Sequence, residues 1–146
     1  MAGLAAVFGS GAMTNSIPEI ENNDVLFVIG SNTTETHPII GLRMKKAVRK
    51  GAKLIVADPR KINLVRFAHS WMQQKPGTDV VLLNAMMHVL LKNNLIDRVF
   101  ILMRTEGFES FKEGLEKYTP EYAEKITGVP RQDIINAALL YGNAER

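Results

Sequence analysis

The spacing of hydrophobic residues changes about half-way along this sequence. In the first half, the apolar runs Val25–Ile29 and Leu54–Ala57 are followed by a glycine and an acidic residue, respectively. Short continuous apolar runs of this kind are typical of strands buried on both faces of a parallel sheet. Between them, apolar residues recur at helical spacing from Pro38 to a glycine at Gly51. The pattern predicts one strand–helix–strand unit over residues 24–58, with parallel strands.

The remaining patterns predict one more strand and a helical second half. Ser70–Gln74 is expected to form the third strand, and Asp79–Lys92 has its apolar residues on one side of a long helix. From Ile96 onward the spacing is helical, in short pieces separated by glycine or proline. The expected fold is a three-layer, Rossmann-like α/β domain with a small parallel sheet and a helical C-terminal part, forming one domain over residues 1–146. The shorter segments predict a short helix at 12–22, a polar loop at 31–37 and a short helix at 62–68.

Composition excludes several classes of chemistry within this chain. There is no cysteine, which excludes disulfides, iron–sulfur ligation, thiolate metal ligands and a cysteine nucleophile. The histidines at positions 37, 69 and 88 are too scattered for a metal site or a catalytic triad. We therefore predict no catalytic residue and no metal ligand. No apolar run approaches the length of a membrane span and no signal peptide is recognised, so we expect a cytoplasmic protein.

Positive charge is concentrated in one part of the sequence. The net charge is +3, yet residues 36–78 hold ten Lys or Arg and a single acidic residue, Asp58. Such asymmetry indicates an anionic ligand or an acidic neighbouring domain, although for the Arg43–Lys50 cluster alone a solvated helix face is the simpler interpretation. Nucleic-acid binding is not expected, because aromatic residues do not interleave with these charges.

Polar residues follow the ends of the expected strands. The carboxyl ends of parallel strands lie at one edge of a sheet, where ligands of open α/β folds bind. We therefore expect these residues to form one nucleotide-binding site. Its candidate members are Gly30, Ser31, Asn32 and Glu35 after the first strand, Asp58 and Arg60 after the second, and Gly77 and Asp79 at the start of the long helix.

These residue types suit the parts of a nucleotide. Gly30 permits close approach of the backbone, and the Asn32 amide offers both a donor and an acceptor. Asp58 follows the second strand directly, at the position where a carboxylate accepts hydrogen bonds from ribose hydroxyls. Arg60 can contact a phosphate through two N–H groups. Asp79 can bring a carboxylate to a guanine edge.

Each candidate also has a simpler structural explanation. Asn32 can form a turn, Asp58 can end a strand, and Glu35 and Asp79 can be acids favoured at helix starts. Taken together, three polar loops at one sheet edge favour binding. The sequence lacks a Walker motif, and Gly9–Gly11 is not a dinucleotide fingerprint because no strand precedes it.

Six segments, in order, closely resemble one family. It is the molybdopterin oxidoreductases, and within it the catalytic (alpha) subunit of formate dehydrogenase. Each segment alone is weakly specific, but the resemblance runs in register over essentially all 146 residues. The segments are Gly9–Ile17, Val28–Glu35, His37-Pro38, Ala57–Lys61, Lys75–Asp79 and Arg104–Phe108.

The resemblance implies a specific cofactor. Members of the family bind two molybdopterin guanine dinucleotides around one molybdenum or tungsten ion, and this chain is expected to hold one guanine dinucleotide arm. Two positions depart from the pattern: Thr33 stands where many relatives have proline, and Glu35 replaces an aspartate of some formate dehydrogenases. The family's contacts to the arm fall on Asn32, Glu35, Asp58, Arg60, Gly77 and Asp79.

The resemblance also implies that the chain is a part of a larger subunit. In the family, a cysteine or selenocysteine that ligates the metal, followed by a histidine, precedes the segment that begins here at Ala2. The expected partners are therefore the remaining domains of the subunit, which would carry iron–sulfur clusters, and electron-transfer subunits. The parent enzyme would oxidise formate to carbon dioxide, whereas this chain alone is predicted to be inactive.

Two other functions remain open at this point. A non-redox central domain like that of thiamine-diphosphate enzymes shares the pattern of an apolar strand, Ile-Gly and a loop, but leaves Gly9–Ile17 and Lys75–Asp79 unexplained. A pure interaction module would use the basic face over residues 43–61. Binding of a guanine nucleotide would distinguish a molybdopterin cofactor-binding domain from both of these alternatives.

Overall fold

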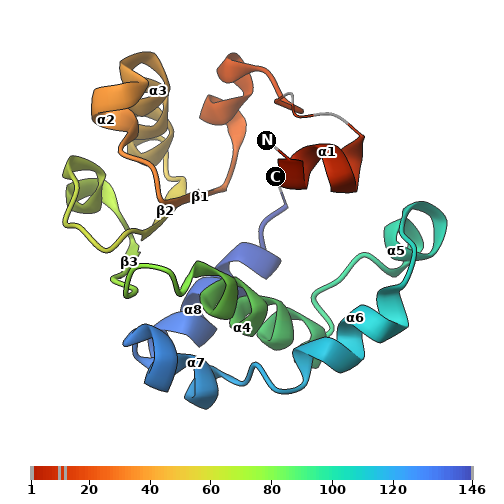
Figure 1. Cartoon of the computed structure of the whole chain (residues 1–146). Helices are drawn as coiled ribbons and strands as arrows, with labels where there is room; N and C mark the ends of the chain where they lie inside the picture. The colour runs from red at the N-terminus through yellow and green to blue at the C-terminus, as the bar shows by residue number, and fades with distance from the viewer. Residues whose placement is uncertain (1, 10, 12, 146) are drawn as a thin grey trace.

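The computed structural model describes residues 2–9, 11 and 13–145 of the chain. It folds into a small sheet with helices on both sides, and a chain of helices leads away from it (Figure 1). In the first part the elements are α1 (Ala2–Phe8), the 3-10 helix η1 (Ile17–Asn22), β1 (Val25–Ile29), α2 (Thr33–Thr36), α3 (Pro38–Arg49), β2 (Lys53–Ala57), the 3-10 helix η2 (Asn63–Phe67) and β3 (Ser70–Met72). The second part consists of α4 (Asp79–Lys92), α5 (Arg98–Arg104), α6 (Phe108–Leu115), α7 (Pro120–Thr127) and α8 (Arg131–Gly142).

The sheet is parallel and has the order β1-β2-β3. Val25 pairs with Lys53 at one end of the β1–β2 ladder and Ile29 with Ala57 at the other. Ala57 also pairs with Met72, so all three strands end at nearly the same level. The predicted parallel strand–helix–strand unit is therefore confirmed.

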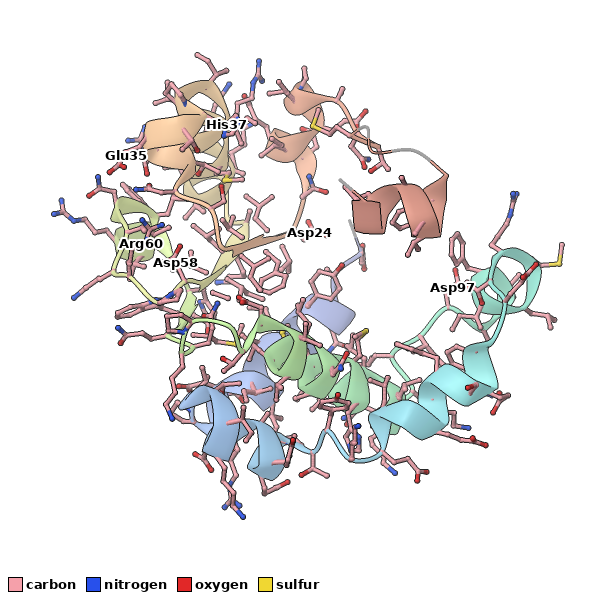
Figure 2. All side chains as sticks on the ribbon, viewed as in Figure 1. Asp24, Glu35, His37, Asp58, Arg60 and Asp97 are labelled. Carbon is pink, nitrogen blue, oxygen red and sulfur yellow. The ribbon has the colours of Figure 1, made fainter. Side chains whose placement is uncertain are left out.

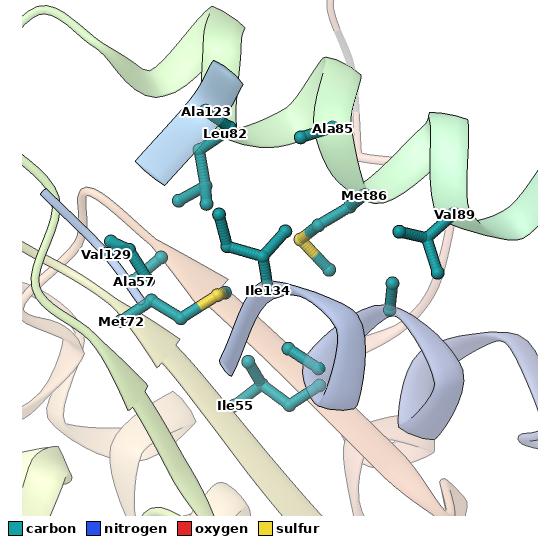
Figure 3. Close-up of a cluster of buried hydrophobic side chains, with 12 residues drawn as sticks. Ile55, Ala57, Met72, Leu82, Ala85, Met86, Val89, Ala123, Val129 and Ile134 are labelled. Carbon is teal, nitrogen blue, oxygen red and sulfur yellow. The ribbon is translucent and has the colours of Figure 1, made fainter. Parts of the chain in front are cut away.

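Two hydrophobic cores lie on the two faces of the sheet. On one face, Leu26, Val28, Leu54 and Val56 pack with residues of α3 and η2. On the other, α8 lies against the sheet and α4 covers α8, with Ile134 between Leu82 and the strand residues (Figure 3). Helices on both faces confirm the α/β class that was expected from the sequence. The second core consists of Ile55, Ala57, Met72, Leu82, Ala85, Met86, Val89, Ala123, Val129, Ile134, Ala137 and Ala138.

Four expected elements differ from the structure in their bounds or type. The helix expected at 12–22 is a 3-10 turn that begins at Ile17, while Ala12 lies outside the described residues. The one expected at 62–68 is also of the 3-10 type. The third strand ends at Met72, two residues earlier than expected, and beyond it Lys75 donates its N–H to the Thr127 carbonyl. The expected loop at 31–37 contains a helical turn, described below.

Local capping explains the helix boundaries of the second half. The Thr119 hydroxyl accepts the N–H of Tyr122 at the start of α7, and Gly128 ends that helix with φ of 78°. Pro130 stands just before α8. Within the described residues, no helix is long and apolar enough to cross a membrane.

Candidate functional site

The polar residues singled out from the sequence lie at the carboxyl edge of the sheet. The Gly30 N–H donates to the Ala57 carbonyl at 3.0 Å, and the Asp58 N–H donates to the Met72 carbonyl at 3.2 Å, so neighbouring strand ends are tied together. Figure 2 shows Glu35, Asp58 and Arg60 on the same side of the molecule, with Asp97 across it. The parallel topology thus brings the three predicted loops to one edge.

Asp58 is the most firmly held of these residues. It follows β2 directly and is only 1% exposed. Its Oδ1 accepts the main-chain N–H of Arg60 at 2.8 Å and the Arg60 Nε–H at 3.3 Å. The Arg60 side chain is 69% exposed, so its guanidinium remains accessible from solvent. A buried carboxylate that orients an accessible guanidinium suits a ligand with phosphate groups.

The loop after β1 forms a single helical turn, α2, where the sequence predicted a plain loop. The Asn32 carbonyl accepts the N–H groups of Glu35 and Thr36, each at 3.0 Å. The Asn32 Oδ1 accepts the hydroxyl of Thr34 at 3.0 Å, so this side chain also bonds within its own turn. Gly30 enters the turn with φ of 60°, which favours glycine. Glu35 is exposed.

α3 supports this turn by close packing. A Cβ on Gly41 would lie 3.3 Å from the Thr33 carbonyl oxygen, so glycine lets α3 approach the α2 backbone. The Thr33 hydroxyl donates to Met44 Sδ at 3.7 Å. The turn that carries Asn32 and Glu35 is thereby held against the start of a longer helix.

The third loop places Gly77 and Asp79 at the start of α4. Gly77 has φ of 80°, and the Thr78 hydroxyl donates to the Lys75 carbonyl at 2.7 Å. Asp79 is the first residue of α4, and its Oδ1 accepts a hydrogen bond from Gln74 Nε2 at 3.0 Å. The helix-start explanation of Asp79 is compatible with the structure, yet its carboxylate also belongs to a partly buried polar pair.

Gln74 is a residue of the candidate site that the sequence interpretation missed. It is 1% exposed, and its Oε1 is buried without a hydrogen-bond partner among the described residues. The sequence pattern places Gln74 at the end of the third strand. The available signal was a polar residue five positions before an acid, which is compatible with a side-chain pair across a turn.

The basic cluster on α3 has a structural partner. Glu21, on η1, lies 2.7 Å from Arg43 Nη1, 2.7 Å from Lys46 Nζ and 3.3 Å from Lys50 Nζ. The hydrogen bond from Lys46, followed by the contacts of Lys50, lowers the pKa of Glu21. These ion pairs join η1 to α3. They support the interpretation of this cluster as a charged helix face that needs no anionic ligand.

Two further lysines cover aromatic rings, which the sequence did not predict. Lys45 Nζ lies 5.2 Å from the centre of the Phe67 ring, and Lys61 Nζ lies 6.0 Å from that of Trp71. Cations at these distances are attracted to the ring faces. Charged and aromatic residues therefore do lie together in this region. The lysines already cover the ring faces on which a base would have to stack.

The candidate site is an open edge rather than an enclosed pocket. One cavity, about 660 Å³, lies where the end of α4 meets α5 and α6. A second, about 590 Å³, lies at the opposite, amino edge of the sheet beside Asp24 and Lys53. No group of three or more His, Asp or Glu residues in the described part could hold a metal ion. The arrangement can bind and orient a polar ligand.

A comparison with known families decides the membership of the chain. The Molybdopterin oxidoreductase family matches residues 3–143. The chain belongs to the molybdopterin oxidoreductases. This membership does not favour the thiamine-diphosphate alternative. Ser10 and Ala12, which belong to the first resembling segment, lie outside the described residues.

Relatives of this molybdopterin oxidoreductase chain include formate dehydrogenases. It is 56% identical over 144 residues to the F420-dependent formate dehydrogenase subunit alpha of Methanocaldococcus jannaschii, covering 99% of this chain and 21% of that protein. It is 47% identical to formate dehydrogenase H of Escherichia coli, covering 99% of this chain and 20% of that protein. The chain thus spans about a fifth of the length of these relatives.

A solved structure shares the fold of this molybdopterin oxidoreductase chain. Acetylene hydratase from Pelobacter acetylenicus matches with a TM-score of 0.77 and 27% sequence identity. The match covers 86% of this chain and 19% of the hydratase chain. The same architecture therefore occurs within a much longer chain.

Proposed function

We propose that this chain binds one guanine dinucleotide arm of a molybdopterin cofactor, as one unit of a formate dehydrogenase. The formate dehydrogenases among its relatives support the choice of parent enzyme. The observation that carries the binding proposal is the geometry of Asp58, a buried carboxylate held by Arg60 at the carboxyl edge of a parallel sheet. A single Rossmann-like domain and a cytoplasmic location remain predictions.

Each of the loop residues is proposed to contact a different part of the nucleotide. Asp58 holds Arg60, two residues on, whose guanidinium contacts the diphosphate. Because the Asp58 carboxylate is 1% exposed, it accepts hydrogen bonds from the ribose hydroxyls only after this loop rearranges. Gly30 and Gly77, both with positive φ, leave backbone open to close approach. Asn32 and Asp79 complete the proposed polar set at the neighbouring strand ends.

The residues of this edge fit the proposed group chemically. A guanine nucleotide combines hydroxyl and N–H donors with anionic phosphates, and the edge offers fixed carboxylates beside an accessible guanidinium. When bound, the molybdenum or tungsten cofactor supplies the two-electron chemistry of formate oxidation. This chain binds and orients the nucleotide end, while the remaining domains and electron-transfer subunits would carry the iron–sulfur clusters.

The test is a calorimetric or NMR titration of this chain with GDP. We expect affinity of about millimolar, because the chain supplies only part of a site. Arg60→Ala should weaken binding about five- to tenfold, since the exposed side chain loses a charge-assisted contact without disturbing the core. Asp58→Asn should also weaken binding, because the amide replaces one acceptor oxygen with a donor.

Arg104→Ala is the matched control, because Arg104 is an exposed arginine at the end of α5. It should bind GDP like the wild type. The proposal is wrong if GDP shifts resonances away from Asn32, Asp58 and Gly77, or if Arg60→Ala and Asp58→Asn both bind unchanged.

A further inference from the structure

Gln74 and Asp79 form a side-chain pair beside the proposed nucleotide site. Gln74 Nε2 donates to Asp79 Oδ1 at 3.0 Å, across the turn that joins β3 to α4. Gln74 is 1% exposed, whereas Asp79 is partly exposed. The buried member of the pair therefore holds the member that a ligand can reach.

The other end of the Gln74 amide is unsatisfied. Its Oε1 is buried and has no hydrogen-bond partner among the described residues. An unpaired buried carbonyl costs stability, and an apolar side chain of similar shape would avoid this cost. Met72, two residues before Gln74, is itself a buried apolar residue. Packing alone therefore does not account for a glutamine at this position.

The Asp79 carboxylate determines which end of the amide faces it. An ionised carboxylate only accepts hydrogen bonds, so it selects the NH₂ group of Gln74 and leaves the carbonyl oxygen on the far side. The unpaired Oε1 is thus a direct consequence of the bond to Asp79. Since Oε1 is buried, it cannot itself contact a ligand without rearrangement.

We propose that Gln74 is a positioning residue that fixes the orientation of the Asp79 carboxylate for a guanine base. This inference rests on the proposed guanine-nucleotide function. Guanine presents two neighbouring N–H donors, N1–H and the 2-amino group, which a suitably oriented carboxylate accepts together. Adenine offers no such pair, so a fixed carboxylate discriminates in favour of guanine.

The test compares Gln74→Met with the wild type, because methionine keeps the length and shape of glutamine but lacks its donor. Gln132→Met is the control, since Gln132 is an exposed glutamine on α8 that bonds to Asn136. Each protein is titrated with GDP and with ADP, and its melting temperature is measured. Gln74→Leu provides a second apolar variant should the methionine protein fail to fold.

We expect Gln74→Met to melt no lower than the wild type and to bind GDP about five- to tenfold more weakly. ADP binding should stay unchanged, so the preference for guanine should fall by the same factor. In the wild type, GDP should shift the Gln74 side-chain NH₂ resonances. In an Asp79→Ala background, Gln74→Met should cause no further loss, because Gln74 acts through Asp79.

The outcomes separate this inference from the function on which it rests. If the wild type fails to bind GDP, the proposed function fails and the inference fails with it. If the wild type binds GDP and Gln74→Met binds equally well, only the positioning role is wrong. If Gln74→Met loses affinity for GDP and ADP equally and also melts at a lower temperature, Gln74 has only a structural role.

Discussion

The indole Nε1–H of Trp71 donates a hydrogen bond of 3.1 Å to the main-chain carbonyl of Asp58, which ties the third strand to the loop after the second. Trp71 is the single tryptophan of the chain, so it reports directly on this loop. We expect GDP to change its fluorescence. The measurement is a fluorescence titration with selective excitation of tryptophan.

Trp71→Phe should destabilise the chain by about 1 kcal/mol, because the Asp58 carbonyl loses its indole donor while most of the ring remains. Urea denaturation measures this change. A GDP-independent tryptophan signal, in a protein that calorimetry shows to bind GDP, would place the nucleotide away from Asp58.

Gly142 marks a tight contact between the end of α8 and α4. A Cβ at this position would lie 2.5 Å from Leu90 Cδ2 and 3.0 Å from Leu95 Cβ, so the surrounding side chains would have to move. Gly142→Ala should therefore destabilise the fold by about 1–3 kcal/mol. Gly114→Ala, inside α6 with nothing within 4 Å, should instead stabilise it by about 0.5–1 kcal/mol. Equal effects of the two substitutions in thermal denaturation would contradict this packing.

Glu21 should make the stability of the chain depend on pH. The hydrogen bond from Lys46 is the largest cause that lowers the pKa of Glu21 in the folded state. A folded-state pKa below the unfolded value adds stability above the unfolded pKa, about 4.3, and this stability is lost as the pH falls through the folded value. Glu21→Gln should lower stability at pH 7 and flatten its fall in acid.

Urea denaturation of the wild type and Glu21→Gln at several pH values measures this dependence. Glu109→Gln is the control, because Glu109 forms an exposed ion pair of 3.7 Å with Lys112. Parallel acid curves for the wild type and Glu21→Gln would show that the cluster does not couple η1 to α3.

The surface of α5 should promote self-association of this chain. Four of its seven residues are apolar and exposed, and Leu102 is 83% exposed. Contiguous apolar surface of this kind favours contact with another protein surface. We expect concentration-dependent association in analytical ultracentrifugation, and Leu102→Lys should reduce it. Leu42→Lys, on α3, is the control and should reduce self-association less than Leu102→Lys does. If Leu42→Lys has the larger effect, the association involves another face of the molecule. The four residues are Val99, Phe100, Leu102 and Met103.

Elements determined by local signals were predicted well from the sequence. The bounds of α4, Asp79–Lys92, agree with the prediction because a turn precedes the helix and its apolar residues recur regularly. β1 and β2 were equally clear, since each is a short apolar run ended by a residue suited to leaving a strand. The helical turn α2 was missed, because it depends on the carbonyl of Asn32 and on packing against Gly41.

The candidate site was predictable in its position but not in its internal contacts. Asp58 and Arg60 could be placed at the sheet edge because a buried strand ends just before them. The burial of Gln74 and its bond to Asp79 required the turn between β3 and α4 to be known. The partner of the Arg43–Lys50 cluster was also missed, because Glu21 precedes Arg43 by more than one complete element.

The position of α8 has a consequence for how the chain folds during synthesis. β1, β2 and β3 leave the ribosome in the order in which they pair, and α3 and η2 can cover one face of the sheet at once. The other face stays open until α8, with Ile134, has been synthesised. At about 5–20 residues per second, the wait between β3 and α8 lasts several seconds. During that interval Ile55 and Met72 are exposed to chaperones and to other nascent chains, and α8 ends this exposure.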